Sequence, residues 1–382
     1  MALEQSEELK ITQAEIRAAE ARYREVAGGW WPEVRAEGTA DFEDEPNRGE
    51  SSEQYRAGVG ASWQIFQGFR TARSAEARQR EADAVTFTSA RFRELLYQDV
   101  ADVFYQTLAL QREANVIEEE IKALDERVQE LEQRVKIGRS RKAELLSART
   151  QASNQRVEAA RVKSLHDASR EMLSFLTGRS TEALHPAEES PLPDAAALAR
   201  YQMRKESRLD IVAAEKSAEA ARLDVKAASG ERNVKISADG NFYVWQDPDD
   251  AGEWDVVIRA ELPLFDGGTR RAGVATSVAR AESQELRLSE LRRIADRDVR
   301  MAAIDFENQL NQWTALQEAL TVTAENVSTQ RADYEIGRAS NLDVLAAMLQ
   351  QFNQEKRAAA LEMQIRATLV RLQVAAGGIE SP

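Results

Sequence analysis

Apolar and polar residues alternate along two short segments of the chain, residues 34–42 and 55–66. The same alternation returns about 200 residues later, in residues 234–245 and 255–265. A period of two places apolar side chains on one face of a β-strand and polar or small side chains on the other. Each segment has about the 9–11 residues that a membrane-crossing strand needs. The pattern therefore predicts four strands, arranged in two pairs.

A hydrophobic residue recurs at every seventh position after each pair of predicted strands. The first row consists of Leu96, Val103, Leu110, Ile117, Leu124 and Leu131. The second row consists of Val299, Phe306, Trp313, Leu320, Val327 and Tyr334. A seven-residue period held over this length predicts long helices wound into a left-handed coiled coil. We expect the acidic run at residues 118–120 to form a solvated face of the first long helix.

The two halves of the chain match each other in register. Gly138 and Gly337 are 199 residues apart, and so are Gly178 and Gly377. A period of this length is far too long for a solenoid, and it indicates a duplicated half.

The duplication predicts the organisation of the chain. We expect a first structural repeat in residues 1–177, an inter-repeat linker or equatorial segment in residues 178–202, and a second repeat in residues 203–378. Each repeat would contain a helix, two strands and a long helical hairpin. The hairpin tips would lie near residues 138–141 and 337–341.

The composition of the 382 residues restricts the class of protein. Hydrophobic residues make up 43% and charged residues 30%, and no apolar run approaches the roughly 20 residues of a spanning helix. A polytopic helical membrane protein is therefore excluded, whereas a strand-built membrane protein would show no such run. The net charge of −14 argues against nucleic acid as a partner, because nucleic acid selects a clustered basic face.

Two features bear on the compartment. The sequence contains no cysteine, so it offers no disulfide, no thiol nucleophile and no cysteine for lipid attachment. Residues 1–5 show no basic segment followed by an apolar one, as a signal peptide would. We expect either that a signal segment is missing from this sequence or that the protein is cytoplasmic.

The order of these elements resembles the TolC-like outer-membrane efflux family, the outer membrane factors. The last strand closes with the sequence PLFDGGTR at residues 263–270, and residues 63–70, WQIFQGFR, are a degenerate first copy. The sequences VKIGRS at residues 135–140 and YEIGRASNLDVL at residues 334–345 resemble the two periplasmic hairpin tips of that family. The sequence departs from the family in its missing export signal, its lack of an anchoring cysteine, and Ala346, where some members carry a second acidic residue.

The resemblance implies a mainly helical fold with β-strands. The duplicated hairpins would form an α-barrel coiled coil, and the four strands would join a trimeric, twelve-stranded transmembrane β-barrel. Four strands cannot close alone, and an open edge in hydrocarbon leaves backbone groups unpaired at several kcal/mol each. The implied protein lies in the outer membrane, surrounded by lipid, with its helical part in the periplasm.

The resemblance also implies a function and partners. The chain would be the exit duct of a tripartite efflux or type I secretion system, and it would conduct substrates passively. A homotrimer would work with a periplasmic adaptor and an inner-membrane pump of the RND, ABC or MFS type. The alternatives are a periplasmic adaptor with its own helical hairpin and a soluble coiled-coil scaffold. Two hairpins and four matched strands disfavour both alternatives.

The resemblance places a periplasmic gate at the hairpin tips. Asp343 aligns with the acidic residue that rings the constriction in the family, and Glu144 is its mate in the first repeat. Three carboxylates around a narrow axis would repel one another, favour cations and raise some of their pKa values. Alternatively, Asp343 only stabilises the first turn of its helix. Tyr334 and Arg338 would hold the closed tip, or they are a coiled-coil core tyrosine and a solvated arginine.

Six tip residues are expected to end helices and to dock an adaptor: Gly138, Arg139, Ser140, Gly337, Ser340 and Asn341. Glycine permits the left-handed position that ends a helix, and Ser340 with Asp343 has the spacing of a capping box. The docking role rests on the resemblance.

Three glycines are expected to form the turns from strand to helix, namely Gly68 in the first repeat and Gly267 and Gly268 in the second. Asp266 or Thr269 is then free to cap the helix that follows. A phosphate-binding loop is a poor alternative, because the surrounding sequence lacks its glycine and lysine spacing.

Aromatic residues gather at the ends of the predicted strands. Trp31, Trp63, Tyr243 and Trp245 fit an interfacial girdle around a membrane barrel, although aromatic residues covering a soluble sheet would look the same. The two histidines lack the spacing of metal ligands, and no carboxylate pairs with a nucleophile or a base. We therefore expect no catalytic site, no metal and no cofactor.

Overall fold

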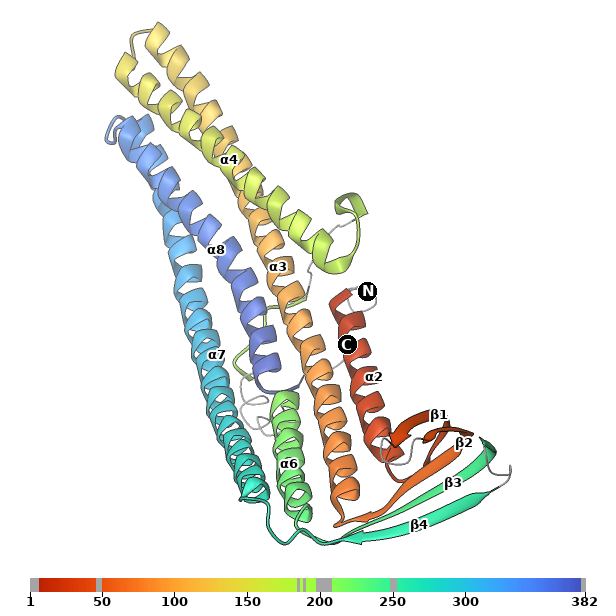
Figure 1. Ribbon diagram of the computed structural model, residues 1–382. Helices are drawn as coiled ribbons and strands as arrows, with labels where there is room; N and C mark the ends of the chain where they lie inside the picture. Colours follow the sequence, from red (N-terminus) through yellow and green to blue (C-terminus); the bar gives the residue numbers. More distant parts are fainter. Residues whose placement is uncertain are drawn as a thin grey trace. The chain divides into compact units, whose positions relative to one another are not determined.

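The computed structural model describes residues 7–45, 50–183, 186–187, 190–196, 208–247 and 253–378 (Figure 1). The helices are α2 (Glu7–Gly28), α3 (Arg70–Lys136), α4 (Lys142–Thr177), α6 (Leu209–Gly230), α7 (Thr269–Glu335) and α8 (Asn341–Ala375), with a short 3₁₀ helix η1 (Thr181–Ala183). The strands are β1 (Glu33–Glu45), β2 (Glu50–Gln67), β3 (Lys235–Asp247) and β4 (Trp254–Glu261). The prediction of a mainly helical fold with four strands is confirmed. None of the described helices is both long enough and apolar enough to cross a membrane.

The fourth strand is shorter than the sequence predicts. A strand is expected over residues 255–265, but β4 ends at Glu261. Pro263 lies just beyond this end, and proline has no N–H to donate to a neighbouring strand. Part of the predicted linker, residues 178–202, lies outside the described residues.

The chain divides into two compact units. The helical unit combines residues 1–10, 90–208 and 293–382, and the sheet unit combines residues 11–89 and 209–292. Each unit takes segments from both predicted repeats, because α3 and α7 each contribute residues to both units.

The sheet unit contains one antiparallel sheet with the strand order β1-β2-β3-β4. The two central strands, β2 and β3, come from different repeats and pair from Tyr55 with Asp247 to Gln67 with Lys235. The register shifts twice along this pair, between Ala57 and Gly58 and between Gln64 and Phe66. The strands β1 and β4 each have one neighbour among the described strands, so both outer edges of the sheet are open.

The register separates the side chains into an apolar face and a polar face. Paired residues of antiparallel strands point to the same side of the sheet. The apolar face includes Val34, Ala36, Phe42, Tyr55, Val59, Ala61, Trp63, Ala238, Phe242, Trp245, Trp254, Val256 and Ile258. The polar face includes Glu33, Arg35, Glu37, Ser62, Gln64, Lys235, Asp239, Asn241, Asp255, Arg259 and Glu261.

Polar side chains bond to one another across the polar face, whereas the apolar face is exposed. The Ser62 hydroxyl donates to Asp239 (2.8 Å), and Arg259 lies 3.5 Å from the same carboxylate. On the other face, Trp254 and Ile258 are 72% and 70% exposed. A soluble monomer rarely leaves such a continuous apolar surface uncovered.

Each hairpin of the helical unit is closed by an apolar seam. Leu124 and Leu131 of α3 are fully buried against Leu145, Ala148 and Ala152 of α4. In the second hairpin, Val327 of α7 packs with Val344, Ala347 and Met348 of α8. These contacts place Leu124 and Leu131 of the first predicted seven-residue row, and Val327 of the second, inside the hairpins.

Glycine turns lead from the sheet into the long helices. Gly68 follows β2 with a φ of 61°, and Gly267 and Gly268 precede α7 with φ of 66° and 90°. Asp266 accepts the N–H groups of Gly268 and Arg270, each at 3.0 Å, and so caps the start of α7.

Candidate functional site

The ends of the two hairpins have the same backbone turn. After α3, the Gly138 N–H donates to the Val135 carbonyl (3.1 Å), and the Arg139 N–H donates to the Arg134 carbonyl (2.8 Å). After α7, Gly337 bonds to the Tyr334 carbonyl (3.1 Å) and Arg338 to the Asp333 carbonyl (2.8 Å). Both glycines have a positive φ, 72° and 75°. This pair of bonds defines a Schellman motif, which glycine favours because it has no Cβ.

The start of α8 is held by a complete capping box. The Ser340 hydroxyl and N–H donate to Asp343 Oδ2 (2.6 and 2.8 Å), and the Asp343 N–H reaches back to the hydroxyl (3.4 Å). The bonds from Ser340, first its side chain and then its backbone, lower the pKa of Asp343. The Asp343 side chain is exposed at the turn. Because its pKa is lowered, it acts within one chain as a charged capping residue.

The start of α4 differs from that of α8. Arg141 stands at the position of Ser340, and its side chain forms no capping bond. Glu144 instead accepts bonds from the Ser140 hydroxyl and from Arg141 Nε (3.1 Å). The Ser140 hydroxyl is the first cause of the lowered pKa of Glu144. Both predicted gate carboxylates are therefore bonded within their own loops.

Tyr334 lies under two arginines of α3. The guanidinium carbons of Arg127 and Arg134 lie 4.0 and 4.7 Å from the centroid of its ring. Arg127 is only 8% exposed, and its Nε donates to the side-chain oxygen of the fully buried Asn341 (2.8 Å). Glu130 pairs with Arg127 and also with Arg134 (2.9 Å). Tyr334 and Asn341 of the second hairpin are thus fixed to α3 of the first.

Arg139 and Arg338, in contrast, lie exposed at the two tips. The prediction groups Arg338 with Tyr334, but the tip network uses Arg127, Glu130 and Arg134, which sequence reasoning missed. These residues could have been found from their spacing, because Arg127 and Arg134 lie seven residues apart and continue a row that begins at Glu120.

The expectation for the acidic run at residues 118–120 is wrong at one position. Glu118 and Glu119 are exposed, but Glu120 is 1% exposed and pairs with Lys356 of α8 (3.2 Å). A helix turns by 100° per residue, so the third glutamate points away from the other two.

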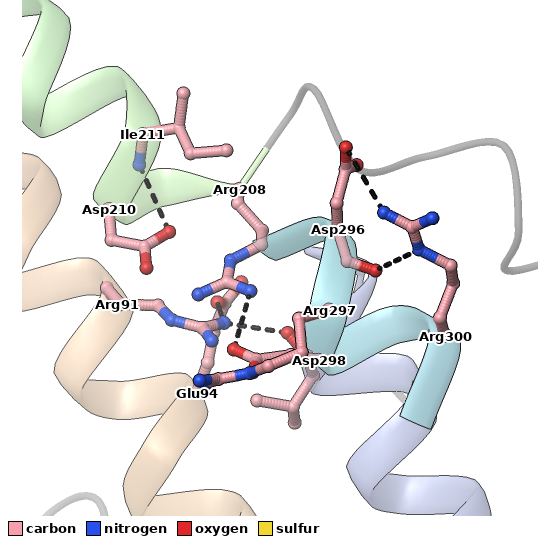
Figure 2. A network of polar contacts seen from close by, with 10 residues as sticks. Arg91, Glu94, Arg208, Asp210, Ile211, Asp296, Arg297, Asp298 and Arg300 are labelled. Atoms are coloured by element: carbon pink, nitrogen blue, oxygen red, sulfur yellow. Dashed lines mark hydrogen bonds and ion pairs between the residues drawn. The ribbon is translucent and has the colours of Figure 1, made fainter. Parts of the chain in front are cut away.

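A second polar network holds the far end of α8 within the helical unit (Figure 2). Arg91 Nη1 donates to the Val374 carbonyl and to Glu94, both at 2.7 Å. Arg208 Nη1 donates to Asp298 (3.2 Å), and the Arg208 backbone would lie 2.9 Å from a Cβ placed on Gly377. Glu94, Asp296 and Asp298 each pair with an arginine in this network, which fits an anchor better than a ligand site.

Aromatic residues of the apolar face lie near both ends of β2, and Phe242 and Trp254 lie level with its middle, opposite Val59. Trp245 stacks on Tyr55 with ring centroids 6.1 Å apart, and the Trp63 indole N–H donates to the Trp30 carbonyl (2.9 Å). Trp31 is 76% exposed. Tyr55 and Trp63 are separated by about 26 Å of strand at roughly 3.3 Å per residue, close to the ~25 Å height of a membrane barrel's apolar band.

Tyr243 differs from the prediction that it belongs to the interfacial aromatics. Tyr243 pairs with Gly58, whereas its neighbour Phe242 pairs with Val59 and Trp254 on the apolar face. Adjacent strand residues point to opposite faces, so Tyr243 belongs to the polar face.

Among the described residues, no group of three or more histidine or acidic side chains is placed to hold a metal ion.

Solved structures share this fold over nearly the whole chain. A membrane protein from Pseudomonas aeruginosa matches with a TM-score of 0.92 at 23% identity, covering 99% of this chain and 88% of its own. The outer membrane protein VceC from Vibrio cholerae matches with a TM-score of 0.88 at 17% identity, covering 99% and 94%. The open state of the MtrE outer membrane channel from Neisseria gonorrhoeae matches with a TM-score of 0.81 at 20% identity, covering 99% and 87%. These matches support the predicted fold, and they do not support the adaptor alternative.

The sequence itself matches one curated relative and one family. Nodulation protein T of Rhizobium leguminosarum bv. viciae is 28% identical over 182 residues, which make up 46% of this chain and 38% of that relative's length. The family described as outer membrane efflux protein matches residues 1–179 and again residues 200–378. Because these two matches together cover most of the chain, the protein belongs to the outer membrane efflux protein family.

Proposed function

We propose that this chain is the outer-membrane exit duct of a tripartite efflux or type I secretion system. It conducts substrates passively from the periplasm to the exterior, and it serves neither as an adaptor nor as a scaffold. The proposal follows from the family and from the sheet, whose continuous apolar face is exposed.

The two faces and the open edges of the sheet give the main support for this function. Its apolar face suits contact with lipid, and its polar face suits a water-filled lumen. Its two open edges, β1 and β4, would be unpaired in hydrocarbon, where each unsatisfied backbone group costs several kcal/mol. Three chains joined edge to edge, β4 to β1, remove every free edge and form a twelve-stranded barrel. We therefore propose a homotrimer.

The helical unit lies in the periplasm and meets the partners there. We propose that the hairpin tips dock a periplasmic adaptor, which couples the duct to an inner-membrane pump of the RND, ABC or MFS type. The exposed Arg139 and Arg338 are available for such docking. The duct itself performs no catalysis and uses no cofactor, because the pump supplies the work.

We propose that the tips also form the gate. The buried contacts inside each hairpin are mainly apolar, whereas α3 and α8 share several polar contacts beside an apolar cluster of Ala101, Val370 and Val374. These polar contacts include Asp102–Arg371, Arg112–Glu362, Glu120–Lys356 and Arg127–Asn341. Separating the hairpins exposes charged groups that water can solvate, together with the small apolar cluster, while separating a hairpin's own helices exposes its whole apolar seam. Each hairpin therefore moves as a body. Asp343, once in each of three chains, surrounds the narrowest point.

The test combines assembly with conductance. The purified chain in detergent should run as a slow species on a denaturing gel before boiling and as a fast monomer after boiling. Inserted into a planar bilayer, it should conduct ions, and Asp343→Ala should raise the conductance. A chain that is soluble and monomeric without detergent overturns the duct. Unchanged conductance and ion selectivity in Asp343→Ala overturn the Asp343 gate alone.

A further inference from the structure

Glu120 is a buried carboxylate between the two hairpins. The α3 residues Ile117, Leu124 and Leu131 on either side of it are fully buried. Glu120 lies among them in sequence, but its partner Lys356 belongs to α8 of the other hairpin. The side chains of Glu120 and Lys356 are only 1% and 16% exposed. The pair therefore joins the hairpins away from bulk water.

The carboxylate is only partly satisfied in this position. Its Oε2 atom accepts from the Lys356 ammonium group (3.2 Å), but the buried Oε1 atom has no hydrogen-bond partner among the residues that the structure describes. An ionised carboxylate needs several donors, and leaving one oxygen unsatisfied in the interior is costly. A proton on this group removes the charge and so removes most of that cost.

Burial of the carboxyl favours the same proton. Burial is the largest cause that raises the pKa of Glu120, and Glu355 of α8 and Glu158 of α4 raise it further. Lys356 opposes the shift of this pKa without cancelling it. Arg161 is the largest cause of the lowered pKa of Glu158, and the charge of Lys356 adds to it, so an ionised carboxylate stays near the ammonium group when Glu120 is neutral.

The duplication shows that this pair is not part of the repeated pattern. The residue that matches Glu120 in the second repeat is Ala319, and the residue that matches Lys356 in the first is Val157. The corresponding helices of the other hairpins, α7 and α4, thus carry a small and an apolar residue at these positions. The two charges occur together at one contact only.

We infer that Glu120 is a proton-dependent positioning residue, which favours contact between the two hairpins when its carboxyl is neutral and weakens that contact when it is ionised. The inference rests on the proposed function, in which the hairpins move apart to open the duct. Because the pKa of Glu120 is raised when the hairpins are together, closing takes up a proton. Acid therefore favours the closed arrangement, and this advantage is lost as the pH rises through the raised pKa.

The absence of cysteine from the chain allows a direct test. Asn115 of α3 and Asn353 of α8 are exposed and uncharged, so the Asn115→Cys, Asn353→Cys variant carries two spin labels without altering the charges of the pair. Labelled chains are diluted with unlabelled full-length chains in detergent, so that the distance within one chain is measured by electron spin resonance between pH 8 and pH 5. We expect a short-distance population that grows as the pH falls.

Three substitutions in the labelled chain separate protonation from packing. Glu120→Gln, a neutral group of the same shape, should keep the short distance at every pH. Lys356→Met removes the cation that opposes proton uptake. The midpoint of the pH-dependent change in distance should therefore move to higher pH. Glu119→Gln changes a residue on the exposed side of the same helix. This variant should show the same change of distance with pH as the unsubstituted chain.

Distances that do not change with pH, distances that lengthen in acid, or a full pH response in Glu120→Gln each overturn the inference. Conductance is recorded separately. A labelled chain that responds to pH but conducts nothing refutes the proposed duct and leaves the role of Glu120 intact. A conducting chain without the pH response refutes the role of Glu120 alone.

Discussion

The guanidinium group of Arg127 lies 4.0 Å from the centre of the Tyr334 ring, although the two residues belong to different hairpins. Arg127 also donates to Asn341, the first residue of α8. One buried arginine of the first hairpin thus contacts both helices of the second. If the hairpins separate to open the duct, this contact must break.

Replacing Tyr334 should therefore favour the open duct. Tyr334→Ala removes the ring that faces Arg127 and Arg134, and each such contact contributes about 0.5–2 kcal/mol. We expect a higher open probability in single-channel recordings, whereas Tyr334→Phe keeps the ring and should resemble the unsubstituted chain. Arg338→Ala is the matched control, because Arg338 is exposed at the same tip. Equal open probabilities in Tyr334→Ala and Arg338→Ala would contradict this role of the ring.

The charge of Asp343 can be separated from its role as a capping residue. Asp343→Asn keeps an oxygen that accepts from Ser340 but removes the charge, so cation selectivity in bilayer recordings should fall. Ser340→Ala weakens the cap by about 1 kcal/mol and keeps the charge, so selectivity should persist. If Ser340→Ala loses selectivity as completely as Asp343→Asn does, capping and not charge explains the effect.

The pH dependence of this selectivity has a definite sign. The bonds from Ser340 lower the pKa of Asp343 below its ordinary 3.8, so in a single chain the carboxylate stays charged down to that value and beyond. Three such groups around one axis would repel one another and raise the pKa of at least one. A loss of cation selectivity well above pH 3.8 therefore indicates that the three carboxylates meet, whereas selectivity that persists down to pH 3.8 indicates that they remain apart.

The two faces of β4 should respond differently to a charge. Ile258 pairs with Ala238 on the apolar face, and its neighbour Val257 pairs with Asp239 on the polar face. Ile258→Arg should destabilise the barrel by about 2–4 kcal/mol if the residue lies near the bilayer midplane, while Val257→Arg should be tolerated. The fraction of slow-migrating trimer on an unboiled gel measures the difference. A trimer that tolerates both substitutions equally would argue against contact of this face with lipid.

The turn at Gly68 should be far less tolerant than the turn at Gly138. Both residues have a positive φ, which costs a residue with a Cβ roughly 1–2 kcal/mol. A Cβ on Gly68 would also lie 2.3 Å from the Gly230 carbonyl oxygen, whereas a Cβ on Gly138 would meet no described atom within 4 Å. We expect Gly68→Ala to reduce the thermal stability of the purified protein much more than Gly138→Ala. Similar losses of stability for both variants would show that the positive φ, and not the close approach of the Gly230 carbonyl oxygen, explains the need for glycine at position 68.

The sequence determined the features of this protein that depend on neighbouring residues. Alternation along residues 34–42 and 55–66 predicts strands, and the register of β1 with β2 places these alternating residues on separate faces. The seven-residue row through Leu124 and Leu131 predicts the buried seam of the first hairpin. The glycines at positions 138 and 337, with Ser340 and Asp343 after the second, predict how helices end and begin. A local period or turn depends on only a few adjacent side chains, so it can be read without knowing the partner.

The tertiary structure decided which partners these elements meet. The sequence shows two strand pairs but not that β2 would pair with β3 across the repeats, and it shows an acidic run but not that Glu120 would lie buried against Lys356. The pairings of Arg127 with Tyr334 and of Gly68 with Gly230 join residues more than 150 positions apart. A charged residue on a helix has the same local preference whether it faces water or another helix, so its role depends on the surface packed against it.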